Sequence, residues 1–268
     1  MMETTELKTR LKSDTEASGS QDVEGGDPQG TTDAVLAALK RLATRAMGLT
    51  GADVERIVRE ARLRARREKR PLTYADLEDG VRGHRPPLPH DVRWRLAMHE
   101  AGHAVVHHAL RLGSIKALTI DSTDGGRNDL SFTGNGPDTS AWYERLLALL
   151  LAGRAAELIS LKSASAGSGG AEQSDLARAT RIALEMEQTL GFGRRHPLLY
   201  LEHKDPTAIL SLDADLANRV HQRLEFAQAR ATEVILENRA AFETLARALF
   251  DAQALEGQAV MDILMSPN

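Results

Sequence analysis

The chain has 268 residues, of which 42% are hydrophobic, 27% are charged and only 4% are aromatic. This composition leaves room for one large and one smaller globular domain, and a core of aliphatic side chains favours helices. The formal net charge of −4 gives no general reason to expect nucleic-acid binding, and the lack of cysteine excludes disulfides and thiolate metal sites.

Residues 1–32 are rich in serine, threonine, glycine and acidic side chains and contain almost no large apolar residue. Such a segment buries too little surface to offset the entropy lost on ordering, so we expect a disordered acidic tail. It lacks the basic start and apolar core of a signal peptide. No stretch of the sequence reaches the roughly 18 apolar residues of a membrane span. We therefore expect no transmembrane segment and a cytoplasmic, bacterial-type location, with any membrane association supplied by partners.

Residues 33–83 are predicted to form a small helical subdomain. Apolar side chains recur at helical spacing over residues 33–46. Thr50 and Asp53 have the spacing of a capping box at the start of a second helix, and Thr73-Tyr74-Ala75-Asp76 starts a third. The second helix ends in a basic run, but glutamates are interspersed and no aromatic residue is available to stack on bases. A solvated helix face is therefore favoured over a nucleic-acid site.

Residues 84–91 contain three prolines, and such a segment is stiff and extended. We interpret it as a linker that marks a domain boundary. The sequence thus predicts a second, larger domain over residues 92–266.

An H-E-x-x-H box, His99-Glu100-Ala101-Gly102-His103, dominates this second domain. On a helix, side chains four residues apart lie on one face about 5–6 Å apart, so His99 and His103 can bind one metal ion. Glu100 lies about 100° further round, where its carboxylate can act as general base on a metal-bound water. The alternative is a chance match on a polar helix face. However, the apolar residues Ala104, Val105 and Val106 indicate a buried helix, in which an unpartnered glutamate would be costly. The box therefore indicates a zinc metallopeptidase site.

A catalytic zinc site of this kind needs a third protein ligand. Asp175 is the best candidate, because it follows a glycine- and serine-rich segment at the start of a helical pattern. Glu172 is a rival ligand, and a helix N-cap formed by Ser174 or Asp175 is the structural alternative. Glu157 is a better candidate for a hydrogen bond to one of the metal-binding side chains than for a bond to the metal itself.

Other features of this domain are predicted from periodicity. His107 and His108 follow the box on the same helix, and we expect surface histidines because better placed groups already fill the metal site. A coiled coil is disfavoured because no heptad pattern is sustained. We expect a strand over 114–120 paired with 130–133 across a loop containing two glycines. Helices are expected over 140–161 and 175–190, and one or two long helices over 211–250.

Over about residues 92–264 the sequence resembles the FtsH-type zinc peptidase domain. The motifs that carry the resemblance occur in the order and at about the spacing of that family. They are His99–His103, Leu151–Glu157, Ser174–Leu176 with Ala179-Thr180, and the stretches Ala229–Ala231, Ile235-Leu236, Asn238-Arg239, Leu245-Ala246 and Leu255–Gly257.

The resemblance implies a mainly α fold with a small β-hairpin or sheet, and it favours Asp175 over Glu172. His99, His103 and Asp175 would be the ligands of Zn²⁺, and Glu100 the general base. Glu157 would orient a zinc-bound imidazole through its other ring nitrogen. In this family a strand lies beside the active-site cleft, where a substrate backbone could add to its edge.

The segment 33–83 resembles the helical lid subdomain of AAA+ ATPases in the same family, with its turns at Gly48–Asp53 and Thr73–Asp76. No G-x-x-x-x-G-K-[S/T] phosphate loop occurs in the sequence, so we expect no ATP hydrolysis by this chain. Either the sequence is part of a longer ATPase–protease, or another protein supplies the motor.

The expected function is therefore a zinc metalloendopeptidase that hydrolyses unfolded or damaged proteins. The resemblance also implies a homo-oligomer, a hexamer, and an AAA+ ATPase partner. The alternatives are a catalytically silent adaptor, or a proteolytic subunit that depends on an ATPase in trans.

Overall fold

The computed structural model describes residues 28–46, 48–83, 88–122, 125–132, 138–166, 169–202 and 206–266. Residues 1–27 of the predicted tail and residues 84–87 of the predicted linker lie outside the described residues. The chain divides into two compact units, residues 1–38 and 39–268. None of the described helices is long and apolar enough to span a membrane.

The N-terminal helices are α2 (Pro28–Arg45), α3 (Gly51–Arg67) and α4 (Tyr74–Gly83). Helix α2 starts before the predicted Asp33, at a proline, a residue whose fixed φ suits the first turn of a helix. Helices α3 and α4 pack on each other. The side chains that α3 buries are Ile57, Ala61 and Ala65, at a spacing of four residues.

Both predicted helix starts in this segment are confirmed. Thr50 Oγ1 accepts a hydrogen bond from the Asp53 amide, and Asp53 Oδ2 accepts one from the Thr50 amide at 3.1 Å, which is a capping box. In the first turn of α4, the Asp76 carboxylate accepts a hydrogen bond from the Thr73 amide at 2.8 Å. It also accepts one from each terminal nitrogen of Arg70, both at 2.6 Å. These bonds hold the pKa of Asp76 well below its usual range.

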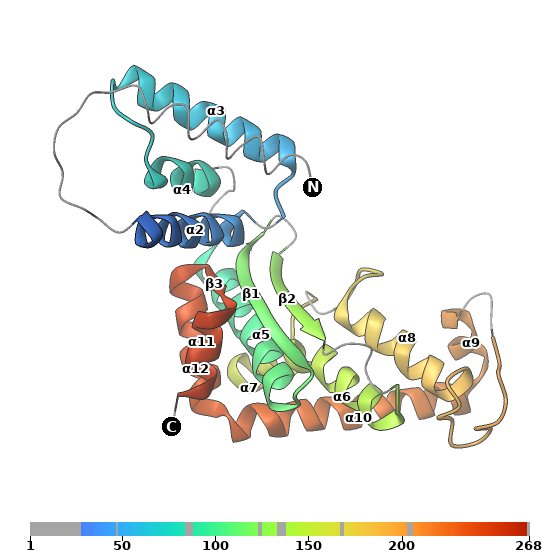
Figure 1. Ribbon diagram of the computed structural model, residues 1–268. Helices are drawn as coiled ribbons and strands as arrows, with labels where there is room; N and C mark the ends of the chain where they lie inside the picture. The colour runs from blue at the N-terminus through green and yellow to red at the C-terminus, as the bar shows by residue number, and fades with distance from the viewer. Residues whose placement is uncertain are drawn as a thin grey trace. The chain divides into compact units, whose positions relative to one another are not determined.

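The remainder of the described chain is built around α5 (His90–Ala109) and a three-stranded antiparallel sheet (Figure 1). The strands β1 (Gly113–Ser122), β2 (Gly125–Phe132) and β3 (Ala254–Glu256) lie in the order β2-β1-β3. The predicted hairpin is confirmed, with Ile115 opposite Leu130. The two glycines expected in its loop instead open β2.

Seven further helices complete the described part of the chain. The helix predicted over 140–161 is two helices, which meet at Leu151, where φ is −91° and ψ is 0°. The segment 211–250 was predicted to form one or two long helices, and it contains two, which meet at Asn238. The elements are α6 (Ser140–Leu150), α7 (Ala152–Leu161), α8 (Asp175–Gln188), α9 (Pro206–Leu212), α10 (Ala214–Glu237), α11 (Arg239–Ala252) and α12 (Gly257–Met265).

Helix α5 is buried on all sides over Ala97–His107. It contacts α7, α11 and the strands β1 and β2 (Figure 1). Its apolar side chains join those of the sheet, α7 and α11 in one core cluster. A second cluster lies between α6, α8 and α10. A helix enclosed in this way holds its polar side chains in fixed positions, which a metal site requires.

Candidate metal centre

Three predicted ligand side chains converge at the middle of α5. His99 Nε2 and His103 Nε2 lie 3.1 Å apart, and Asp175 Oδ2 lies 3.3 Å from the first and 3.1 Å from the second. The two histidines come from successive turns of α5, and Asp175 is the first residue of α8. Among the described residues, these three form a group able to hold a metal ion.

The spacing of these three atoms fits a tetrahedral zinc ion. Ligand atoms about 2.0–2.1 Å from a tetrahedral zinc are about 3.3 Å from one another. The three separations, 3.1, 3.1 and 3.3 Å, are close to that value.

The hydrogen bonds behind the histidines assign their tautomers. His99 Nδ1 lies 2.9 Å from Glu157 Oε1, and His103 Nδ1 lies 2.8 Å from the carbonyl oxygen of Leu149. Both partners are acceptors, so both Nδ1 atoms carry the proton in the neutral rings and both Nε2 atoms are unprotonated. Two nitrogen lone pairs and one carboxylate then face a single point, and only a cation can stabilise that arrangement.

The electrostatics of the cluster agree with this requirement. Burial lowers the pKa of His99, but hydrogen bonds with Asp175 and Glu157 outweigh it and raise the pKa to about 10. Burial similarly opposes ionisation of Asp175, but the hydrogen bonds of His103 and His99 keep its pKa below the usual range. These shifts show that the cluster favours a positive charge beside the Asp175 carboxylate.

Glu157 lies behind His99 on α7 and is almost completely buried. Its carboxylate accepts hydrogen bonds from Arg95 Nη1 at 2.7 Å, from the Ser165 amide at 2.7 Å and from the Ser165 hydroxyl at 3.0 Å. These bonds and that of His99 outweigh the effect of burial and lower the pKa of Glu157 to about 2. Arg154, three residues before Glu157 on the same helix, does not pair with it in the described structure and donates from Nε to Gln228 Oε1 at 3.1 Å.

Glu100 is buried on α5 beside the cluster, where its charge raises the pKa of His99. Asn128 Nδ2 donates to Glu100 Oε2 at 2.7 Å, so β2 positions this carboxylate. No sequence pattern indicates Asn128, because its contact with Glu100 depends on how β2 packs on α5 in the tertiary fold. Arg95 did have a signal, since it precedes His99 by one helical turn.

Two glycines allow α5 and α7 to approach closely. A Cβ on Gly153 would lie 2.4 Å from the Cε1 and Nε2 atoms of His99. A Cβ on Gly102 would lie 2.8 Å from the carbonyl oxygen of Ala152. Both distances are impossible, so the position of His99 depends on the absence of these side chains.

The structure corrects the prediction that His107 lies at the surface. His107 is fully buried, whereas His108 is partly exposed. His107 shares a helix face with His99 and His103, and it lies beside Ser131 of β2. Burial lowers the pKa of His107 to about 4, although the nearby backbone of Ser131 partly opposes the shift.

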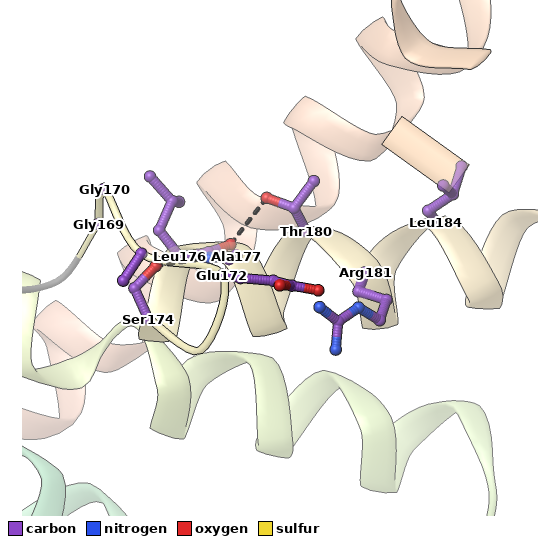
Figure 2. Close-up of a pocket in the computed structure, with 10 residues that line it drawn as sticks. Gly169, Gly170, Glu172, Ser174, Leu176, Ala177, Thr180, Arg181 and Leu184 are labelled. Atoms are coloured by element: carbon purple, nitrogen blue, oxygen red, sulfur yellow. Dashed lines mark hydrogen bonds between the residues drawn. The ribbon is translucent and has the colours of Figure 1, made fainter. Parts of the chain in front are cut away.

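Glu172, the rival ligand, lies away from the histidines. It lines a cavity of about 610 Å³ beside α8, together with the outward-facing residues Ala177, Thr180 and Arg181. Figure 2 shows its carboxylate extending toward Arg181. Ser174 is the N-cap of α8 and accepts a hydrogen bond from the Ala177 amide, so the predicted cap and a metal-facing Asp175 occur together.

Comparison with known proteins agrees with this geometry. The model of peptidase family M41 matches residues 88–263. The chain is 30% identical over 247 residues to the ATP-dependent zinc metalloprotease FtsH 1 of Sorangium cellulosum, covering 83% of this chain and 39% of that protein. It is 31% identical over 235 residues to the ATP-dependent zinc metalloprotease FtsH of Halothermothrix orenii, covering 78% and 37% respectively.

The chain thus spans roughly two fifths of the length of these curated relatives. The family model covers both turns of the box, α7 and the start of α8. The chain therefore belongs to peptidase family M41, with a peptidase domain of the FtsH type.

Proposed function

We propose that this chain is a zinc metalloendopeptidase that hydrolyses peptide bonds of unfolded or damaged proteins. The observation that carries the proposal is the convergence of His99, His103 and Asp175 on one point beside Glu100. Membership of a peptidase family supports it, as do relatives that are named zinc metalloproteases.

In this proposal His99, His103 and Asp175 hold Zn²⁺, which when bound acidifies a water and polarises the peptide carbonyl. Glu100 takes the proton of the attacking water and passes it to the leaving amine. Asn128 fixes the Glu100 carboxylate through one oxygen. The enclosed helix and sheet around these groups exclude bulk solvent, which strengthens the electrostatic interactions of the site.

We propose that an extended substrate segment adds to β2. In the described part of the chain β2 is paired only with β1, so it forms an edge of the sheet. Since Asn128 of β2 also contacts Glu100, a peptide on this edge would run close to the general base. Peptides with N-methylated backbone amides should be cleaved more slowly than unmodified ones, and equal rates for both would count against the idea.

The helices α2, α3 and α4 are proposed to be the lid-like subdomain of an AAA+ ATPase. The alignment with the Sorangium relative covers 83% of this chain, a larger share than the family match over residues 88–263. We further propose that ATP-driven unfolding is supplied by an AAA+ ATPase, in a longer form of the chain or in a partner, within a homo-hexamer. Co-purification of such an ATPase activity would support this, and full activity without ATP on a folded substrate would contradict it.

The test of the proposed base is Glu100→Gln, with cleavage of unfolded casein as the measurement. We expect loss of at least roughly 10²-fold in rate with zinc retained, because the amide cannot accept the proton. Glu172→Gln is the matched control, since it neutralises a carboxylate away from the cluster, and it should leave both zinc and rate unchanged. Retained hydrolysis in Glu100→Gln would overturn the assignment of the base.

A further inference from the structure

A second cavity, of about 510 Å³, lies between α6 and α10 and shares no residue with the metal cluster. Its size is within the range of small-molecule sites, about 300–1,000 Å³. Leu147 and Ala227, both buried, contribute to its lining. The residues that give it its chemistry are Glu144, Arg145, Arg194, Arg223, Phe226 and Arg230.

Positive charge predominates among the side chains that line the cavity, although the chain as a whole is acidic. Four guanidinium groups line it with one carboxylate, that of Glu144. The other carboxylates that neutralise the lining arginines are Glu187, which Arg223 shares with Arg219, and Glu233, which pairs with Arg230. Even with these ion pairs included, guanidinium groups exceed carboxylates in the cluster. The excess positive charge favours an anionic ligand.

Two of the arginines are held in place. Arg223 donates from Nε to Glu187 and from Nη2 to the carbonyl oxygen of Phe192, both at 2.6 Å, and its side chain is only 15% exposed. Arg145 donates from Nη1 to the carbonyl oxygen of Leu110 at 3.3 Å. Fixed guanidinium groups bind an oxyanion at little cost in side-chain entropy, and their planar donors match phosphate oxygens.

Phe226 gives the cavity a second kind of contact. Its ring is 67% exposed, although aromatic residues are only 4% of this chain. An exposed ring in a cavity with an apolar floor offers a stacking surface for a flat ligand. The combination therefore selects a molecule with an oxyanion at one end and a ring at the other.

We propose that this cavity binds a small organic phosphate that carries a flat ring, of the nucleoside monophosphate class. The arginines bind the phosphate, and Phe226 stacks on the ring. The site is separate from the peptidase centre, so it does not depend on the proposed peptidase function.

The test is calorimetric titration of the whole chain, at low salt, with adenosine monophosphate, inorganic phosphate and adenosine. We expect adenosine monophosphate to bind at least tenfold more tightly than either of the other two. Arg194→Ala and Arg230→Ala should each weaken adenosine monophosphate and phosphate alike, by about fivefold or more. Phe226→Ala should weaken adenosine monophosphate and leave phosphate binding unchanged.

Arg239→Ala is the matched control, because Arg239 is an exposed arginine on α11 that pairs with Glu243. This variant should bind adenosine monophosphate as tightly as the unmodified chain does. Equal thermal melting of all variants verifies that they fold.

The proposal is overturned if adenosine monophosphate shows no saturable binding. It is also overturned if binding is unaffected in all three pocket variants, as it would be if the phosphate bound at the metal centre. Salt-dependent self-association that the arginine variants abolish, without binding of adenosine monophosphate, would instead identify this face as a contact between copies of the chain.

Discussion

The Nδ1 atoms of His99 and His103 each face a hydrogen-bond acceptor. The acceptor is the Glu157 carboxylate for His99 and the Leu149 carbonyl oxygen for His103. An acceptor in this position fixes the tautomer and increases the basicity of the metal-facing nitrogen. We therefore expect Glu157→Gln to lower zinc affinity by roughly 10–100-fold, measured by competition with a chromophoric chelator at a temperature where the variant is folded. A merely structural Glu157 would lower the melting temperature and leave zinc affinity in the folded protein unchanged.

The buried His107 should make the free energy of unfolding decrease as the pH falls. Its pKa of about 4 in the folded chain is below the roughly 6.5 of an unfolded histidine, so the unfolded chain takes up the proton first as the pH falls. The stabilising effect of neutral His107 is complete above about pH 6.5 and is lost progressively toward pH 4. Between about pH 6.5 and pH 4, the free energy of unfolding should fall more steeply in the unmodified chain than in His107→Leu. Urea denaturation with a chelator present measures this difference. The matched variant His108→Leu should keep the slope of the unmodified chain, and a His107→Leu variant that also keeps it would contradict the account.

At the residue scale, the sequence predicted what depends on local spacing. The pairing of His99 with His103 follows from the helical period. Asp175 lies 72 residues beyond His103, and its selection over Glu172 needed the family resemblance. Asn128 was missed because its contact with Glu100 depends on how the hairpin lies on α5, which periodicity does not specify.

Between elements, the close approach of α5 and α7 determines where His99 lies. Gly153→Ala would place a methyl group against the His99 ring, and the ring or the helix would have to move. We expect at least roughly a tenfold loss of zinc affinity, together with about 1–3 kcal/mol of destabilisation typical of overpacking. Zinc competition and urea denaturation measure the two effects. Gly51→Ala is the control, because a Cβ there meets nothing within 4 Å, and the contact is unimportant if both variants bind zinc equally.

The elements that sequence predicted well are those with local signals. The capping box at Thr50 and the hairpin of β1 with β2 both have short-range patterns, and both are present. The break at Leu151 had none, because Leu150 and Ala152 on either side are both good helix formers. Strand β3 has only three residues, too few to show a period, and its pairing with β1 depends on α11 and α12.

On the scale of the whole molecule, the mainly α fold with a small sheet could be predicted from composition and the family resemblance, and it is confirmed. The division into tail, lid-like segment, linker and peptidase domain stays a prediction. The chain covers roughly two fifths of the length of its relatives, so the ATPase, the assembly and the natural substrate are proposals for this chain.

The central claim is that His99, His103 and Asp175 together hold zinc. Elemental analysis of the purified and dialysed chain tests it most directly, beside Asp175→Ala and the matched variant Glu172→Ala. We predict one zinc per chain in the unmodified protein and in Glu172→Ala, and at least about tenfold weaker zinc binding in Asp175→Ala. A folded chain without zinc would contradict the claim, as would zinc that survives Asp175→Ala and is lost in Glu172→Ala.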